Sequence, residues 1–121
     1  MHPTLTTSDT LSLNPATTLQ RLRALEHLYE QGYQDEVVDL TVHKLVEHQV
    51  QKEETQLAEL AAELVKYEQR FAMQSAHFEQ KYQQGEMGDD ADSFEWHVLY
   101  TMHQRLRSEL EFLKAQLPTI A

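Results

Sequence analysis

Seven histidines in a chain without cysteine are the residues that most invite a chemical role. His43 and Glu47 stand four residues apart, a spacing that places two metal ligands on one face of a helix. His48 is five residues from His43, and neither belongs to an H-E-x-x-H motif. His97 and His103 fall on different sides of their helix. We therefore interpret His43 as a helix-contact residue and His48 as a solvated one, and we predict no metal site.

A cluster of carboxylates is the second chemical candidate. Asp89, Asp90, Asp92 and Glu95 resemble a calcium loop in charge, but the D-x-D-x-D-G spacing is absent. Carboxylates at the start of a helix bind its unpaired N–H groups and are favoured by its dipole, so we predict a helix cap instead. The chain also lacks G-x-S-x-G, P-loop and G-x-G-x-x-G motifs. We expect neither an enzyme nor a cofactor.

The charge balance limits the class of partner. Twenty acidic and ten basic residues give a net charge of −10, which opposes binding to nucleic acid or to an anionic bilayer. Without a signal-peptide start or an apolar run of about 18 residues, we expect a cytoplasmic protein without a membrane span. The long helix expected below carries an acidic face, formed by Glu53, Glu54, Glu59, Glu63 and Glu68. That face is either a solvated surface or an electrostatic surface for a basic protein.

The scarcity of Gly and Pro, three of each, favours an all-α fold of one helical domain over residues 14–121. Residues 1–13 are rich in Thr and Ser and are expected to form a disordered tail. Asn14 and Pro15 supply an N-cap and a first helical residue, and Gly32 supplies a C-terminal stop. We predict a first, amphipathic helix over residues 15–31.

A long helix is expected from Asp35, which is predicted to cap its N-terminus, to Ala72, because this span contains no Gly or Pro. About 37 residues correspond to roughly 55 Å, so the helix needs a partner along its length. Its second half has apolar residues on a and d positions of one heptad frame, with Glu53 as the exception. The first half departs from that frame, which suggests a change of packing partner near residue 50.

A corner over residues 72–93 is predicted to reverse the chain. Ser75 is expected to cap a short helix that carries Phe78 and ends at Gly85, and the Asp cluster precedes a last helix over 92–117. Two apolar seams joined by this corner predict an antiparallel coiled-coil hairpin. The residues expected to form the hairpin core are Leu57, Leu60, Leu64, Phe71, Trp96, Leu99, Leu106, Leu110 and Leu113.

The last helix is too short to cover the whole long helix. The uncovered apolar residues are Val38, Val42, Leu45 and Val46. They have to be covered by the first helix or by another chain, and a long helix shared between two copies is a common route to dimers. We predict a homo-oligomer with these residues at the interface.

The corner also carries a family resemblance. Residues 66–75 (KYEQRFAMQS), Phe78, residues 84–96 (QGEMGDDADSFEW) and residues 99–100 resemble a family of small, mostly uncharacterised bacterial, often cyanobacterial, helical proteins. These are similar to the antitoxins encoded beside TumE-like toxins. The resemblance covers residues 40–113, and the chain departs from it at Ala72, where a Gly is usual, and at residues 76–77, where acidic residues are usual. The resemblance implies a helical fold and a genomic context beside a toxin gene; a molecular activity does not follow from it.

Two functions remain open for this chain. The first is a non-enzymatic protein-interaction module, antitoxin-like, that binds and neutralises a basic toxin protein. The second is a self-assembling structural protein. For the first function, the acidic and aromatic surface expected to bind the partner consists of Tyr67, Glu68, Phe78, Asp89 and Asp90.

Overall fold

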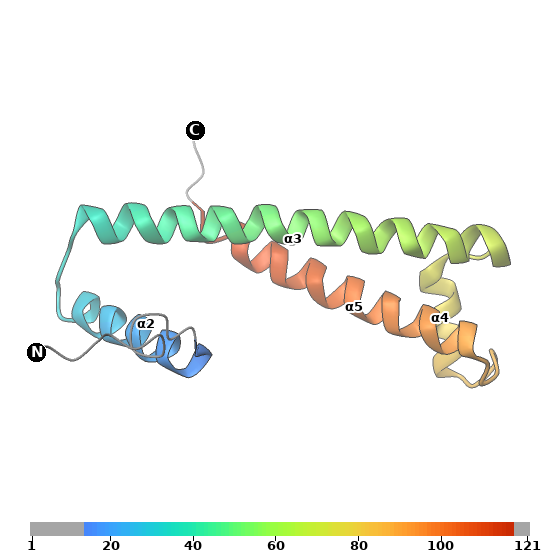
Figure 1. Ribbon diagram of the computed structural model, residues 1–121. Helices are drawn as coiled ribbons and strands as arrows, with labels where there is room; N and C mark the ends of the chain where they lie inside the picture. The colour runs from blue at the N-terminus through green and yellow to red at the C-terminus, as the bar shows by residue number, and fades with distance from the viewer. Residues whose placement is uncertain (1–13, 118–121) are drawn as a thin grey trace, which may run out of the picture. The chain divides into compact units, whose positions relative to one another are not determined.

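The protein is all-α. The computed structural model describes residues 14–117, which form four helices and no strand: α2 (Pro15–Glu30), α3 (Glu36–Phe71), α4 (Ser75–Gln83) and α5 (Ala91–Lys114) (Figure 1). Each predicted helix is present, with ends within three residues of those expected. The expected tail, residues 1–13, lies outside the described residues. The chain divides into two compact units, Met1–Leu40 and Thr41–Ala121.

In the first unit, α2 begins where the sequence predicts. The Asn14 side chain accepts a hydrogen bond from the backbone N–H of Ala16 at 2.8 Å, and Pro15 is the first helical residue. Gly32 follows the helix with a φ of 97°, which a side chain would disfavour. No residue of α2 is buried, and its apolar face is exposed, formed by Leu19, Leu22, Leu25 and Leu28.

A carboxylate caps the start of α3. Asp35 Oδ1 accepts hydrogen bonds from the N–H groups of Val37 at 2.7 Å and Val38 at 3.3 Å. The Tyr33 hydroxyl donates to the other oxygen of Asp35 at 3.0 Å. The hydrogen bond from Tyr33, with those from the backbone, lowers the pKa of Asp35. The predicted capping role of Asp35 is confirmed.

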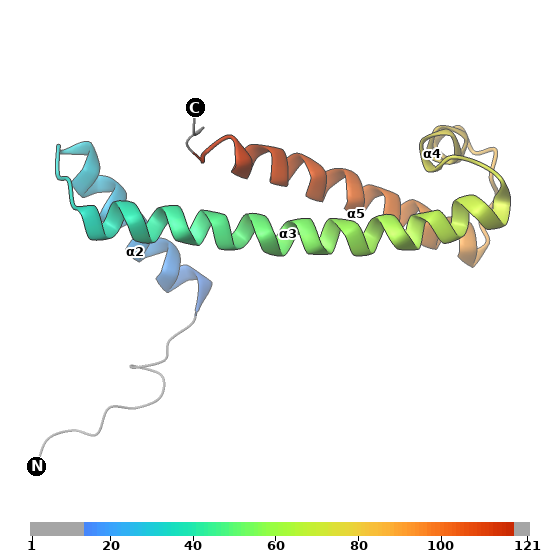
Figure 2. The same ribbon diagram turned by 90° about the horizontal axis from the view of Figure 1, so that it is seen from above.

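The second unit contains most of α3 together with α4 and α5. Figures 1 and 2 show α5 beside the second half of α3, with α4 near the end of α3. Side chains join the two longer helices at three places. The Tyr67 hydroxyl donates to Glu95, Arg70 pairs with Asp92 at 2.8 Å, and Lys114 pairs with Glu54 at 2.9 Å.

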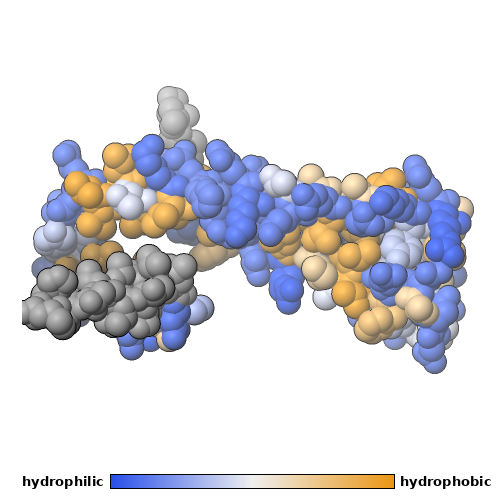
Figure 3. All heavy atoms as spheres, viewed as in Figure 1, coloured by the Kyte–Doolittle hydropathy of each residue, from blue (hydrophilic) through white to orange (hydrophobic). Residues whose placement is uncertain are grey.

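The core of this unit is small. Leu64, Phe78 and Trp96 form a buried cluster, against which Tyr67, Met73, Tyr82, Met87, Leu99 and Tyr100 pack. Figure 3 shows hydrophobic side chains between α3 and α5, beneath the hydrophilic outer face of α3. Of the expected hairpin core, Leu64, Trp96 and Leu110 are buried and Phe71 is 39% exposed. The half-buried members are Leu57, Leu60, Leu99, Leu106 and Leu113.

The residues predicted to lie at an oligomer interface differ in exposure. Val42 and Leu45 are exposed, at 42% and 55%, whereas Val38 and Val46 are half-buried. Their covering by another chain stays a prediction. None of the helices within residues 14–117 has the length and apolar character that a membrane crossing requires.

Candidate functional site

Trp96 is the centre of the corner where α3, α4 and α5 meet. Its ring stacks on Phe78 from α4 at a centroid distance of 3.9 Å and an interplanar angle of 7°. Tyr67 and Phe71, at the end of α3, stack on it at 5.6 Å each. Burial of the Trp96 and Phe78 rings stabilises this unit.

The one polar group of the Trp96 side chain, the indole N–H, has a hydrogen-bond acceptor in Ser75. The indole Nε1–H donates to Ser75 Oγ at 2.9 Å, and both side chains are buried. Ser75 was expected to cap α4, and this expectation is wrong: the N-cap residue is Gln74, which makes no side-chain cap hydrogen bond. A carboxylate from the preceding helix replaces the cap, because Glu68 Oε2 accepts the backbone N–H of Ser75 at 2.9 Å.

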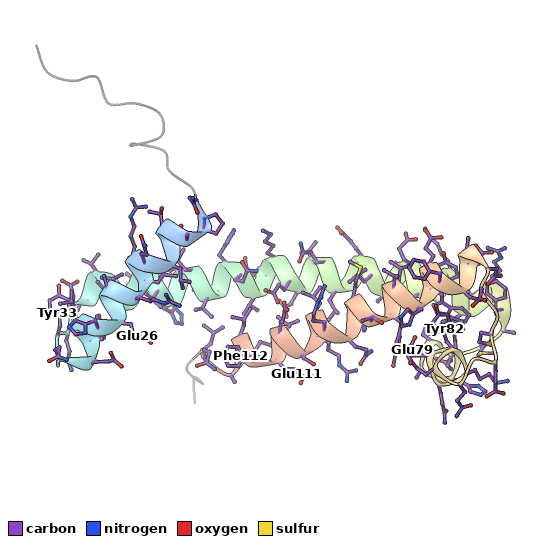
Figure 4. The ribbon with its side chains drawn as sticks, turned by 90° about the horizontal axis from the view of Figure 1, so that it is seen from below. Glu26, Tyr33, Glu79, Tyr82, Glu111 and Phe112 are labelled. Atoms are coloured by element: carbon purple, nitrogen blue, oxygen red, sulfur yellow. The ribbon has the colours of Figure 1, made fainter. Side chains whose placement is uncertain are left out.

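A second contact joins α4 to α5. His97 Nδ1 lies 2.8 Å from Glu79 Oε1 and 3.0 Å from Oε2, and the imidazole stacks on Tyr82 at 4.4 Å. Figure 4 shows Glu79 and Tyr82 on α4 where it meets α5. His97 is therefore half-buried and held in place. His103, one and a half turns further along α5, is half-buried too, and burial lowers its pKa.

The acidic cluster begins α5, as predicted. Asp90 is the N-cap residue, and its Oδ1 accepts the backbone N–H of Ser93 at 3.1 Å. Hydrogen bonds from Ser93 lower the pKa of Asp90. Asp92 pairs with Arg70, whereas Asp89 is exposed and makes no side-chain hydrogen bond to any residue within 14–117. Two of the three aspartates therefore have structural roles.

The predicted partner surface is only partly accessible. Phe78 exposes none of its surface and belongs to the core, so in this structure it offers nothing to a partner. Tyr67 is half-buried; burial, and then its hydrogen bond to Glu95, raise the pKa of its hydroxyl. The side chains of Glu68 and Asp90 cap the N-termini of α4 and α5, respectively. Asp89 is the one member that is exposed and makes no side-chain hydrogen bond to a residue within 14–117.

The candidate metal ligands do not converge. His43 Nε2 lies 3.5 Å from Glu47 Oε1, an ordinary pair one helical turn apart. In the described part of the chain, no three His, Asp or Glu side chains are grouped closely enough to hold a metal ion. The hydrogen bonds of the corner cap helix N-termini or join neighbouring helices, which is typical of a packing and capping network.

Glu53 was expected to belong to the acidic face of the long helix, and this expectation is wrong. Its side chain is only 5% exposed, which makes it a buried charged residue of α3. Oε2 accepts a hydrogen bond from Gln49 Nε2 at 2.7 Å, and Oε1 has no partner in the described structure. The signal was present, because Glu53 is the one charged residue on the apolar seam of the second half of α3.

Comparisons of the chain with protein-family models, with curated proteins and with solved structures found no match.

Proposed function

We propose that this protein is a non-enzymatic protein-interaction module that binds a basic partner protein. In this proposal the partner is a toxin that the module neutralises in the cytoplasm. The proposal is supported by one observation above all: large apolar side chains remain exposed on every long helix, while only five apolar side chains within residues 14–117 are buried. These side chains leave apolar surface on each long helix available to a binding partner.

The charge of the chain favours a basic partner. A net charge of −10 attracts a positively charged protein over distances of about a Debye length, roughly 8 Å at physiological salt, and accelerates association. All ten basic side chains lie among twenty acidic ones, so a nucleic acid would meet repulsion instead. A basic toxin is also the partner expected if the resemblance of residues 40–113 to antitoxin-like proteins extends to function.

The architecture proposed for this module is an antiparallel coiled-coil hairpin of α3 and α5, closed by the corner at Trp96. The order of the contacts supports it, since Glu54 meets Lys114 and Arg70 meets Asp92. Later residues of α3 thus pair with earlier residues of α5, as an antiparallel arrangement requires. We further propose that two or more copies associate through Val42 and Leu45, with Val38 and Val46 beside them.

A competing function is a self-assembling structural protein. The exposed leucines of α2 favour it, because four of them recur every three residues along one helix. A stripe of this kind buries its surface against another helix, and a second copy supplies one. In this alternative, assembly of the chain with itself is the whole function.

Co-expression with the product of the adjacent gene distinguishes the two functions. The interaction module is expected to co-purify with that product and to restore growth when the product is toxic. Charge reversal is best placed at Asp89, because Glu68 and Asp90 also stabilise helix ends. We expect Asp89→Lys to weaken the complex, and Glu30→Lys, an equal charge change on α2, to leave it intact. If no complex forms and growth is not restored while the chain self-assembles, the structural alternative is the correct one.

A further inference from the structure

An open groove runs between α3 and α5 in the second unit, with a volume of about 800 Å³. Its floor is apolar, formed by the half-buried Leu60 and Leu106 together with Met102, which is 40% exposed. Its rim carries three glutamates and one arginine, all of them exposed. An apolar floor between polar rims is the kind of surface that accepts the apolar face of an amphipathic helix.

The first unit contains such a helix. No residue of α2 is buried, and Leu19, Leu22, Leu25 and Leu28, called the leucine face below, are 36–48% exposed. Leu19 and Leu28 are roughly 14 Å apart along the axis of α2, and the groove, which spans about two turns of α3, is roughly 11 Å long. The leucine face and the floor of the groove therefore match in length and in apolar character.

The charges of the two surfaces are complementary. Three carboxylates against one guanidinium make the rim of the groove negative. Two of these carboxylates, those of Glu59 and Glu109, are exposed and make no ion pair within residues 14–117. On α2, the exposed Arg21 lies four residues before Leu25, at the edge of the leucine face. When the leucines enter the groove, Arg21 meets the acidic rim, which favours association.

The α2 helix is too short to bring its leucine face to the groove of its own chain. The Tyr29 hydroxyl, in the last turn of α2, donates a hydrogen bond to Asp39 Oδ1 at 2.6 Å, which ties this end of α2 to the beginning of α3. From Asp39 to Leu60, α3 extends for roughly 30 Å, whereas α2 extends for only about 15 Å from Tyr29 to Leu19. Even an α2 laid back along α3 would end short of the groove. The leucine face can fill the groove of another copy only.

We infer that the leucine face of α2 binds in the α3–α5 groove of a second copy of the chain, an inference that rests on the proposed self-association and names the two surfaces that take part. Each chain has one leucine face and one groove, so two copies that exchange their α2 helices use both and form a closed dimer. The exchanged α2 adds a third helix to each pair of α3 and α5 and covers the apolar floor between them.

Cross-linking tests the contact directly, because the chain has no cysteine. Full-length Glu26→Cys, at the other edge of the leucine face, is mixed with full-length Gln56→Cys or Arg105→Cys, on the two rims of the groove. Each chain then has one thiol, so a short bifunctional maleimide that links the two variants has to join two copies. Ala58→Cys, exposed on another face of α3, is the matched control. We expect Glu26→Cys to link to at least one rim variant, and about tenfold less to Ala58→Cys.

Variants of each surface give an independent test by sedimentation equilibrium. Leu22→Gln together with Leu25→Gln, the leucine variant, changes exposed residues and should weaken self-association by about tenfold or more, because two apolar contacts are lost. Met102→Glu should do the same from the side of the groove. Val65→Gln, at an exposed apolar residue of α3 outside the groove, should stay within about twofold of wild type. Circular dichroism checks that each variant remains helical. Unchanged self-association of the leucine variant, or equal cross-linking to Ala58→Cys, would overturn the inference.

The outcomes separate this inference from the proposed function. If the leucine variant self-associates like wild type and changes at Val42 and Leu45 abolish assembly, the proposed interface is real and the exchange of α2 is wrong. If the cross-links form and no basic partner is found, the exchange stands and the proposed toxin binding fails. If the leucine variant keeps its mass but no longer binds the partner, α2 binds the partner and the inference is wrong. A monomeric wild type would contradict both the exchange and the proposed self-association.

Discussion

Ala72 occupies a backbone conformation that suits glycine. Its φ is +50°, in the left-handed region, directly after the last residue of α3. The turn is nevertheless a regular helix ending, because the N–H of Met73 donates to the carbonyl of Glu68 at 3.2 Å. An L-residue with a side chain pays a conformational penalty of about 1 kcal/mol here.

Ala72→Gly is therefore expected to stabilise the protein by roughly 0.5 kcal/mol, because the greater freedom of glycine in the unfolded chain offsets part of the penalty that is removed. Thermal melts measure the change. The same substitution at Ala62, an exposed interior position of α3, should lower stability by about 1 kcal/mol. Destabilisation by both changes would contradict the left-handed conformation of Ala72.

Ser75 is the residue for which local sequence reasoning was wrong. A serine before a helical stretch predicts an N-cap. That prediction uses only the neighbours of the serine along the chain. The structure instead uses its hydroxyl to accept the Trp96 indole N–H, a contact between residues 21 positions apart. No local pattern records such a contact, and the same holds for the cap that Glu68 provides from the previous helix.

Ser75→Ala is expected to destabilise the protein by about 1–3 kcal/mol, because the buried indole N–H loses its acceptor. Chemical denaturation gives the free energy of unfolding directly. In the background of Trp96→Phe, which has no N–H to satisfy, the serine change should cost distinctly less. Equal costs in the two backgrounds would show that the hydrogen bond contributes nothing.

At the scale of elements, the helices and their ends were predictable. The signals are local: Asn14 and Pro15 begin α2, Asp35 caps α3, and Asp90 caps α5. The last helix ends at Lys114, three residues before the expected end at residue 117. What each apolar face contacts was less predictable, because periodicity defines a face and says nothing of the element that covers it.

The cap of α5 makes stability depend on pH. Folding lowers the pKa of Asp90, so the unfolded chain binds its proton more tightly. The stabilisation is therefore present above the ordinary pKa of 3.8 and is lost as the pH falls below it, toward the lower pKa of the folded state.

Asp90→Asn keeps a capping oxygen but does not titrate. Its melting temperature should lie below that of wild type at pH 6, and the difference should shrink as the pH falls from about 5 to 3. The matched change Asp89→Asn, at an exposed residue without a capping role, should leave the wild-type profile unchanged. A constant difference between Asp90→Asn and wild type over this range would mean that the cap does not depend on ionisation.

The whole molecule has two properties that favour binding to another protein, its negative charge and its exposed apolar surface. The sequence predicted both, since composition fixes the charge of −10 and the last helix was expected to be too short to cover Val42 and Leu45. The heptad pattern shows that Glu53 is a charged residue on the apolar seam of α3. That its Oε1 lacks a hydrogen-bond partner is visible only in the structure, because the sequence does not give the positions of the donors.

The exposed valine and leucine give a prediction for assembly. Val42→Asp together with Leu45→Glu places charges on the proposed interface between copies, where burial would be costly. The double variant should remain helical by circular dichroism and should lose self-association. A double variant with the same mass as wild type would place the interface elsewhere.

If this protein acts by binding other protein chains, its molar mass in solution shows the complexes. Light scattering after gel filtration is measured for the protein alone and for its mixture with the product of the adjacent gene. We predict a mass that is a multiple of 14.1 kDa for the protein alone and a larger, mixed complex after addition of the partner. A single 14.1 kDa species at micromolar concentration, unchanged by the addition, would contradict the account.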